Sequence, residues 1–276
     1  MKRRLSTILL VVIFLTGLSL LLYPTVSELW NSFHQSRAVS SYAQTVSDID
    51  DEVYEQLLEE ARAYNAALAQ TGMKPELTPE EAAEYDSVLA VTDSGIMGYV
   101  QIPKIDVTLP VYHGTEEAVL QTAVGHLEGT SLPVGGESTH CVVTGHRGLP
   151  SARLFTDLAK LTQGDTFTLN VLDEVLTYEV DQIRVVLPYD MSDLQIVPGE
   201  DYCTLITCTP YGINTHRLLV RGHRIATKYV SNVRVTADAM QVEPAVVAVF
   251  IAAPVLFLAA LAVLIMPKKK KQTARS

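Results

Sequence analysis

Two long apolar runs near the ends of the chain frame a middle region of mixed apolar and polar positions. The run 5–23 contains 19 residues and the run 245–266 contains 22, and neither includes a charged residue. As helices they would extend about 29 and 33 Å at about 1.5 Å per residue, which matches the hydrocarbon core of a bilayer. We therefore expect one transmembrane helix near each end of the chain.

Positive charges lie on the outer side of both runs. Lys2, Arg3 and Arg4 precede the first run, and four lysines, 268–271, follow the second. The positive-inside rule then places both termini in the cytoplasm and the middle region outside the plasma membrane. A cleaved signal peptide is the alternative for the first run, but no small-residue cleavage site follows Tyr23. A buried core helix is the alternative for the second run, and the four lysines favour a stop-transfer end instead.

The middle region begins with helical patterns. Residues 46–68 place apolar side chains on one stripe of a helix, and Gly72 with Pro75 beyond it ends the pattern. Thr78 is followed by a proline and two glutamates, which is typical of an N-cap and the first turn of a helix. We therefore expect a second short helix that runs to about Val88.

Short segments rich in β-branched residues follow from Gly98 onward, with turn residues between them. So many short strands are typical of one closed, antiparallel-rich barrel or sandwich, and we expect a mainly β fold. The predicted strands are 98–103, 107–112, 139–144, 166–171, 174–187, 202–207 and 216–225, with short helices at 115–124 and 151–158.

The charge of the chain is divided unevenly. The net charge is −10, but all 31 acidic residues lie between Pro24 and Pro244, with only 13 of the 21 basic ones. The middle region therefore carries −18. Such a surface repels nucleic acid and anionic headgroups, and it suits a cationic partner, although solubility alone also accounts for it.

The chain has three cysteines, Cys141, Cys203 and Cys208. No pair has the C-x-x-C spacing of a thioredoxin-type redox site or a zinc knuckle, so neither class is supported. An extracellular compartment permits disulfides, but an odd count leaves one thiol unpaired within the chain.

Three side chains with complementary chemistry lie at the ends of predicted strands. Cys208 ends one apolar segment, Arg217 opens the next, and His146 follows a third. A thiol, a base and a permanent cation are the components of acyl transfer, in which the arginine donates to the oxyanion, a contact worth about 3–4 kcal/mol. Alone, each has a simpler interpretation as a core thiol, a turn histidine or a solvated arginine. The combination is more specific.

These motifs resemble the sortase family. The segment 204–208 matches the signature T-L-x-T-C, the spacing from Cys208 to Arg217 is that of sortases, and Thr144, Gly145 and His146 form the histidine motif. The resemblance extends over about 97–224. The segments 125–133, 146–150 and 207–217, and the two terminal membrane segments, look like class C, the pilin-polymerising sortases.

The resemblance implies an eight-stranded β-barrel and a cysteine transpeptidase. Cys208 would attack the Thr–Gly bond of an LPXTG-like sorting signal, His146 would act as acid and base, and Arg217 would stabilise the oxyanion. A pilin lysine would resolve the thioacyl enzyme, and no metal or organic cofactor is implied. Thr207 and His126 are candidate substrate-binding residues within the matching motifs.

Other functions are compatible with the same residues. A housekeeping sortase would attach surface proteins to cell-wall peptide with the same three side chains. A non-catalytic membrane assembly scaffold is a second class, which the intact spacing disfavours. An extracytoplasmic thiol oxidoreductase that uses Cys203 and Cys208 is a third class, which the absence of C-x-x-C disfavours.

The resemblance also carries expectations for the lid and for the other two cysteines. Class C sortases usually have an Asp-Pro-aromatic lid motif over the catalytic cysteine, and none occurs in this chain, so lid gating by the segment 72–95 is in doubt. The family places His146 and Cys208 at matching ends of neighbouring parallel strands. Cys141 and Cys203, each five residues earlier, would then lie side by side as a disulfide or as two packed thiols.

Together these observations divide the chain into six parts. They are an N-terminal transmembrane anchor at 1–23, an extracellular helical and lid-like segment at 24–96, a catalytic β-barrel at 97–230, a linker at 231–244, a transmembrane helix at 245–266 and a basic cytoplasmic tail at 267–276.

Overall fold

The computed structural model describes residues 2–92, 94–227, 252 and 254–258. The chain divides into two units, one of Met1–Ser27 with Ala239–Ser276 and one of Glu28–Asp238. The predicted linker and basic tail lie outside the described residues. Of the predicted second transmembrane helix only 252 and 254–258 are described, and these are helical.

The N-terminal apolar run lies in helix α1, Lys2–Ser47. It is the one helix among the described residues that is long and apolar enough to cross a membrane. The helix does not end with the apolar run at Tyr23 but continues through Pro24 to Ser47. The reason is that proline removes one backbone donor and costs a few kcal/mol, which the remaining hydrogen bonds of a long helix can offset.

Three helical segments pack against the barrel within the larger unit: the end of α1, α2 (Asp51–Thr71) and α3 (Pro79–Ser87). The predicted helix 46–68 is interrupted, because α1 ends at Ser47 and α2 begins at Asp51. The N-cap prediction at Thr78 is confirmed as a capping box with Glu81, in which each side chain bonds the other's backbone N–H.

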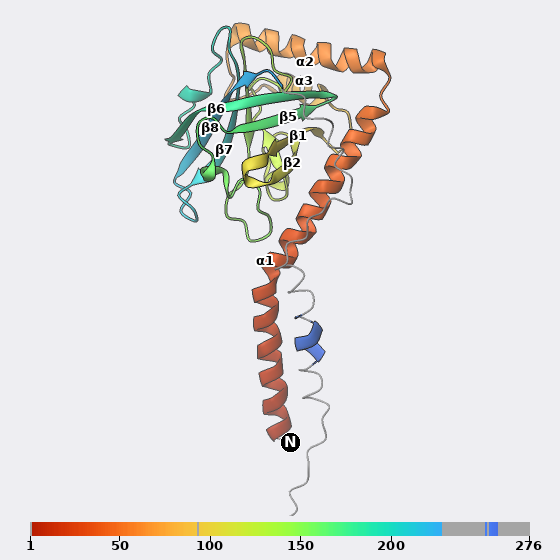
Figure 1. The fold of residues 1–276 in the computed structure, drawn as a ribbon, viewed down its shortest axis with the longest axis vertical. Coiled ribbons are helices and arrows are strands. Elements are labelled where there is room, and N and C mark those ends of the chain that lie inside the picture. The colour runs from red at the N-terminus through yellow and green to blue at the C-terminus, as the bar shows by residue number, and fades with distance from the viewer. Residues whose placement is uncertain (1, 93, 228–251, 253, 259–276) are drawn as a thin grey trace, which may run out of the picture. The chain divides into compact units, whose positions relative to one another are not determined.

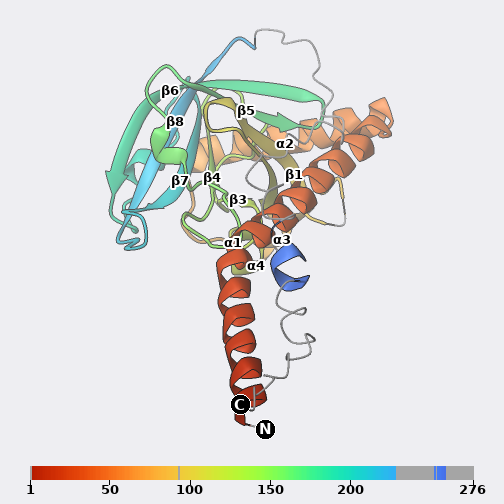
Figure 2. The same ribbon diagram turned by 60° about the horizontal axis from the view of Figure 1, so that its bottom comes forward.

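Eight strands form a closed barrel in the order β1-β2-β3-β4-β7-β8-β6-β5 (Figures 1 and 2). Only the β2–β3 and β4–β7 pairs are parallel, so the prediction of an antiparallel-rich barrel is confirmed. The strands are β1 (Ile96–Ile102), β2 (Val107–His113), β3 (Val124–His126), β4 (Thr139–Thr144), β5 (Thr166–Val171), β6 (Glu174–Val186), β7 (Asp201–Thr209) and β8 (His216–Ile225).

One local prediction is confirmed only in part, and another was wrong. The helix predicted at 115–124 is one turn, α4 (Glu117–Leu120), and strand β3 follows it. The helix predicted at 151–158 is a series of turns that ends in a 3-10 turn, η2 (Leu158–Lys160). Three residues of β3 are too few to show an alternating pattern, so the sequence signal could not separate them from the turn before.

The barrel interior is filled with aliphatic and aromatic side chains. Phe167 and Tyr178 stack with their ring centroids 5.6 Å apart. A Cβ at Gly222 would lie 2.9 Å from both side chains, so glycine is needed where β8 passes them. The hydroxyl of Tyr42 joins α1 to the barrel, because it donates to Met97 O at 2.9 Å and accepts from Leu172 N at 2.7 Å.

Candidate active site

Cys208 and Arg217 face each other across the β7–β8 hairpin. They are direct partners in the antiparallel register, and Val186 of β6 lies opposite Arg217 on the other side. Partners directly opposite in an antiparallel pair project from the same face of the sheet. The thiol and the guanidinium therefore belong to one face of neighbouring strands.

The parallel β4–β7 pair brings His146 to the same end of the barrel. The register runs to Thr144 opposite Ile206, and Gly145 N then donates to Ile206 O at 3.0 Å. The same offset of 62 residues places His146 beside Cys208. His146 and Cys208 are both partly exposed, so the base and the thiol are open to a substrate.

The alternation of β7 separates interior from exterior residues. Cys203, Leu205 and Thr207 are buried in the barrel, whereas Ile206 and Cys208 lie on the outer face. Thr207 is 1% exposed, and its Oγ1 donates to Gly145 O at 2.8 Å. This hydroxyl holds the strand end that carries His146 against β7, and a contact of Thr207 with substrate stays a prediction.

His126 is also buried. It is 0% exposed, and its Nε2 donates to Ser131 O at 2.8 Å, which leaves Nδ1 as an acceptor. The Tyr85 hydroxyl lies 2.9 Å from Nδ1 and accepts from Gly114 N at 3.0 Å. The ring joins helix α3 to strand β3 through Tyr85, and a contact of His126 with substrate stays a prediction.

Glu117 is a neighbour of His146 that sequence reasoning missed. Its Oε2 lies 3.6 Å from His146 Nε2, within ion-pair range when the imidazole is protonated. Glu117 belongs to α4, 29 residues before the histidine, and no motif connects the two. Only the fold, which places α4 beside the end of β4, brings this carboxylate to the site.

The β7–β8 loop holds Arg217 in place. Pro210 O accepts from Ile213 N at 3.1 Å and from Asn214 N at 2.9 Å, which closes a tight turn. Asn214 adopts a left-handed conformation with φ of 59°, which asparagine tolerates. The Arg217 guanidinium donates to the carbonyls of Asn214 and His216 at 3.4 and 3.3 Å. These contacts are long, and the side chain retains free donors for a substrate oxygen.

Arg147, next to the histidine, links β4 to the same loop. Its Nη1 donates to Thr209 Oγ1 at 3.2 Å, and its guanidinium lies 5.8 Å from the centre of the Tyr211 ring. Its Nε is buried without a hydrogen-bond partner among the described residues.

Cys141 and Cys203 are direct partners in the β4–β7 register, as predicted from their equal offsets. Both are buried, and both are free thiols in the structure. Burial raises the pKa of the Cys203 thiol, and the neighbouring Cys141 adds to that increase. The pair belongs to the barrel interior, apart from the outer face that carries Cys208.

The lid-like segment covers part of the outer face near the candidate site. Met73 follows the C-cap of α2 and packs in an outer apolar cluster with Ile206 and Leu219. Lys74 N donates to Gly129 O at 3.0 Å, and its Nζ pairs with Glu81 at 2.5 Å. Leu77 packs against the main core instead. The start of the lid-like segment therefore belongs to an apolar cluster that also includes Ile206, two positions before the thiol on the same face.

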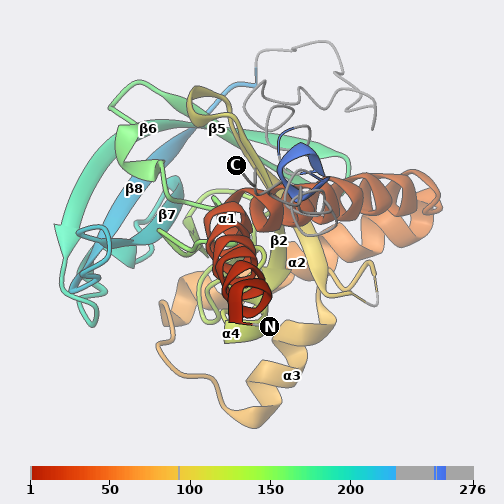
Figure 3. The ribbon, with the colours of Figure 1, turned by 90° about the horizontal axis from the view of Figure 1, so that it is seen from below.

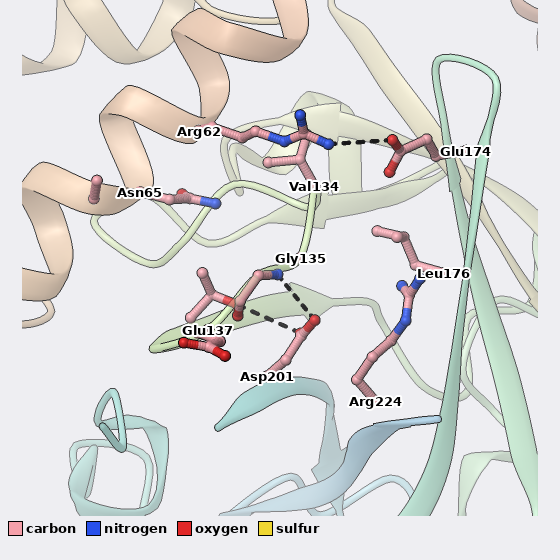
Figure 4. A pocket seen from close by; sticks show the side chains of 12 residues that line it. Arg62, Asn65, Val134, Gly135, Glu137, Glu174, Leu176, Asp201 and Arg224 are labelled. Atoms are coloured by element: carbon pink, nitrogen blue, oxygen red, sulfur yellow. Dashed lines mark hydrogen bonds and ion pairs between the residues drawn. The ribbon is translucent and has the colours of Figure 1, made fainter. Parts of the chain in front are cut away.

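A pocket of about 340 Å³ lies at the other end of β7, between α2 and the barrel (Figure 4). Asp201 begins β7 there, about 23 Å from Cys208 at roughly 3.3 Å per residue. No thiol or imidazole lines this pocket. The pocket therefore lacks the nucleophile and the base that the strand ends bring together at Cys208.

Among the described residues, no group of three or more metal-ligating side chains is arranged to hold a metal ion.

Comparisons with known proteins all identify the same family. Residues 100–225 match the family described as "Sortase domain". The chain is similar to sortase C1 from Streptococcus agalactiae, with 55% identity and a TM-score of 0.68, over 70% of this chain and 100% of that one. It is also similar to sortase C of Streptococcus pneumoniae, with 48% identity and a TM-score of 0.63, over 70% and 98% of the two chains. Among curated proteins it is 29% identical to sortase D of Bacillus subtilis (strain 168) over 131 residues. That match covers 46% of this chain and 63% of the relative.

Proposed function

Since this chain belongs to the sortase family, whose members are cysteine transpeptidases, we propose that it cleaves an LPXTG-like sorting signal and joins it to a pilin lysine. The observation that carries the proposal is the row of His146, Cys208 and Arg217 at the matching ends of β4, β7 and β8. The row combines a nucleophile, a base and an oxyanion donor without a metal.

The first half-reaction transfers the acyl group to the enzyme. The Cys208 thiolate attacks the carbonyl carbon of the threonine, and the developing oxyanion accepts from the Arg217 guanidinium. Collapse of this intermediate breaks the Thr–Gly C–N bond, and His146 gives its proton to the leaving glycine amine. The product is a thioester between the sorting signal and Cys208.

The second half-reaction releases the enzyme. A lysine ε-amine of the acceptor attacks the thioester carbonyl and passes its proton to His146. The C–N bond of the isopeptide forms as the C–S bond breaks, and Cys208 returns to its starting state. The His146 proton therefore leaves in the first half-reaction and returns in the second, and the Glu117 carboxylate lies 3.6 Å from the ring that carries it.

Similarity to class C structures supports a pilin as the substrate. The sortase C1 match has 55% identity over 70% of this chain, and so extends beyond the catalytic motifs. The S. pneumoniae structure is described as giving insight into the pilin substrate specificity of that protein. A plasma-membrane location with both termini in the cytoplasm completes the proposal, and the apolar part of α1 supports it. Attachment to cell-wall peptide is the competing outcome.

The test uses the full chain in detergent micelles with an LPXTG-containing peptide. Mass analysis should find a thioacyl adduct on Cys208 and the released glycine-terminated fragment. Cys208→Ala should give neither, whereas Cys203→Ala, which removes a buried thiol five residues along the same strand, should give both. Addition of Nα-acetyl-lysine amide or triglycine then distinguishes a lysine acceptor from a cell-wall type of amine. Absence of any adduct would refute transpeptidation.

A further inference from the structure

A hydrogen bond joins the residue after the proposed base to the residue after the proposed thiol. Arg147 follows His146 directly, and Thr209 follows Cys208 at the end of β7, which lies beside β8 (Figure 3). Arg147 Nη1 donates to Thr209 Oγ1 at 3.2 Å. The guanidinium therefore connects the histidine segment, residues 146–148, to the strand end that carries the thiol.

An aromatic ring of the β7–β8 loop packs against the same histidine segment. The Arg147 guanidinium lies 5.8 Å from the centre of the Tyr211 ring, which is within cation–π range. Gly148 has a φ of 76°, and a Cβ at this position would lie 2.8 Å from Tyr211 Cε2. The ring therefore lies directly on the backbone of residue 148, and two neighbouring residues of the histidine segment contact the loop after Cys208.

The loop 151–156 holds the backbone of the histidine segment from elsewhere in the barrel. Phe155 N donates to His146 O at 3.1 Å, and Gly148 N donates to Thr156 Oγ1 at 3.0 Å. Neither bond involves β7. Among the described residues, the histidine segment makes one hydrogen bond to β7 or to its following loop, and the donor is Arg147.

Arg147 occupies this position although one of its donors is left unsatisfied. Its Nε is buried and has no hydrogen-bond partner among the described residues. Buried donors of this kind are rare in native proteins and call for an explanation. The contacts of the same guanidinium with Thr209 and Tyr211 supply one, because an Arg147 side chain that turned to solvent would leave the two segments unconnected.

We propose that Arg147 is a positioning residue, which holds the imidazole of His146 in line with Cys208 so that its proton reaches the leaving amine. The inference rests on the proposed function, because it concerns the proton that His146 gives in the first half-reaction. Arg147 acts through the backbone of the neighbouring histidine and not on the reacting atoms. A displacement of about 1 Å can cost about 100-fold in rate, so the step that needs this proton should be the most sensitive one.

Two substrates for the full chain in micelles separate proton transfer from the other steps. One is an LPXTG-containing peptide, whose leaving glycine amine takes a proton from His146 as the C–N bond breaks. The other is the p-nitrophenyl ester of the same peptide truncated at its threonine. Its C–O bond breaks without a proton, because p-nitrophenolate leaves as an anion. Both reactions form the same thioester with Cys208.

Arg147→Met removes the guanidinium and keeps an unbranched side chain. It should lower the ratio of the amide to the ester thioacylation rate by at least about 10-fold, while KM for the LPXTG peptide changes less than about twofold. The ester reaction also reports whether the variant is folded, since it needs an accessible Cys208 and an intact binding surface.

Two further variants locate the effect. Thr209→Val removes the hydroxyl that accepts from Arg147, and it should lower the same ratio by about threefold or more. When Arg147→Met is already present, Thr209→Val should lower the ratio by less than about twofold, because the two side chains act through one contact. Arg184→Met is the matched control, since the exposed Arg184 guanidinium pairs with Asp193 at 3.7 Å, and it should keep the ratio of the unsubstituted chain.

Each outcome decides the proposal. An equal fall of the amide and ester rates in Arg147→Met would overturn the positioning role and leave the proposed function intact. A raised KM with an unchanged kcat would assign Arg147 to substrate binding instead, and independent effects of the two substitutions would overturn the link through Thr209. Absence of a thioacyl adduct from either substrate in the unsubstituted chain would overturn the proposed function before any variant is compared.

Discussion

The sharpest stability prediction concerns the Tyr85 hydroxyl, because two buried polar groups have it as their hydrogen-bond partner. Tyr85 is 0% exposed, accepts from Gly114 N at 3.0 Å and donates to His126 Nδ1 at 2.9 Å. Tyr85→Phe keeps the ring and its packing but leaves both groups without their partner. A buried group that loses its hydrogen bond costs about 1–3 kcal/mol, so the free energy of unfolding should fall by about 2–6 kcal/mol.

Urea unfolding of the full chain in micelles measures this loss. With a slope of about 2 kcal/mol per molar, the midpoint should fall by roughly 1–3 M. Tyr99→Phe is the matched control, since Tyr99 is half-buried and no described residue hydrogen-bonds its hydroxyl, so its midpoint should change little. A loss below about 1 kcal/mol for Tyr85→Phe, equal to that of the control, would refute the account of Tyr85 as the anchor of α3.

Three further predictions concern the row of strand ends and the interior of the barrel. Arg217→Lys should lower kcat by about 100- to 1,000-fold, because an ammonium cannot reproduce the guanidinium fork. The rate of thioacyl formation should fall most, and a near-normal rate in single-turnover assays would contradict this. Burial lowers the pKa of His140, so the unfolded chain takes up a proton that the folded chain does not, and stability should fall as pH drops through about 6.5. Urea midpoints at pH 7.5 and 5.5 measure this fall, which should be smaller in His140→Gln; an equal fall in both would contradict it. Labelling the denatured, unreduced chain should modify Cys141, Cys203 and Cys208, and one reactive thiol would instead indicate a disulfide between the first two.

Seven of the eight described strands were predictable, because each is a run of six or more residues rich in apolar and β-branched side chains, whereas the three residues of β3 were too few. The three site residues were predictable for a related reason: each ends or opens such a strand. The burial of Thr207 and His126 was not predictable, because motif membership does not say which face of a strand a residue occupies. Strand alternation would have helped for Thr207, since a neighbour of an outward-facing Cys208 must point inward.

Contacts that depend on tertiary structure left no local signal. Glu117 reaches His146 from a single helical turn, and Met73 reaches the outer face of β7 from the segment after α2. Both contacts join parts of the chain far apart in sequence. No periodicity or spacing encodes them, because the closure of the barrel decides which distant segments become neighbours.

The parallel pairing of β4 with β7 has a consequence for when the protein becomes reactive. Its 62-residue separation means that thiol and base meet only after a long loop closes, and such contacts form late because their closure entropy precedes any gain in packing. A nascent or partly folded chain therefore carries Cys208 without His146, its proposed catalytic partner, beside it. Completion of the barrel is therefore the step that brings the proposed thiol and base together.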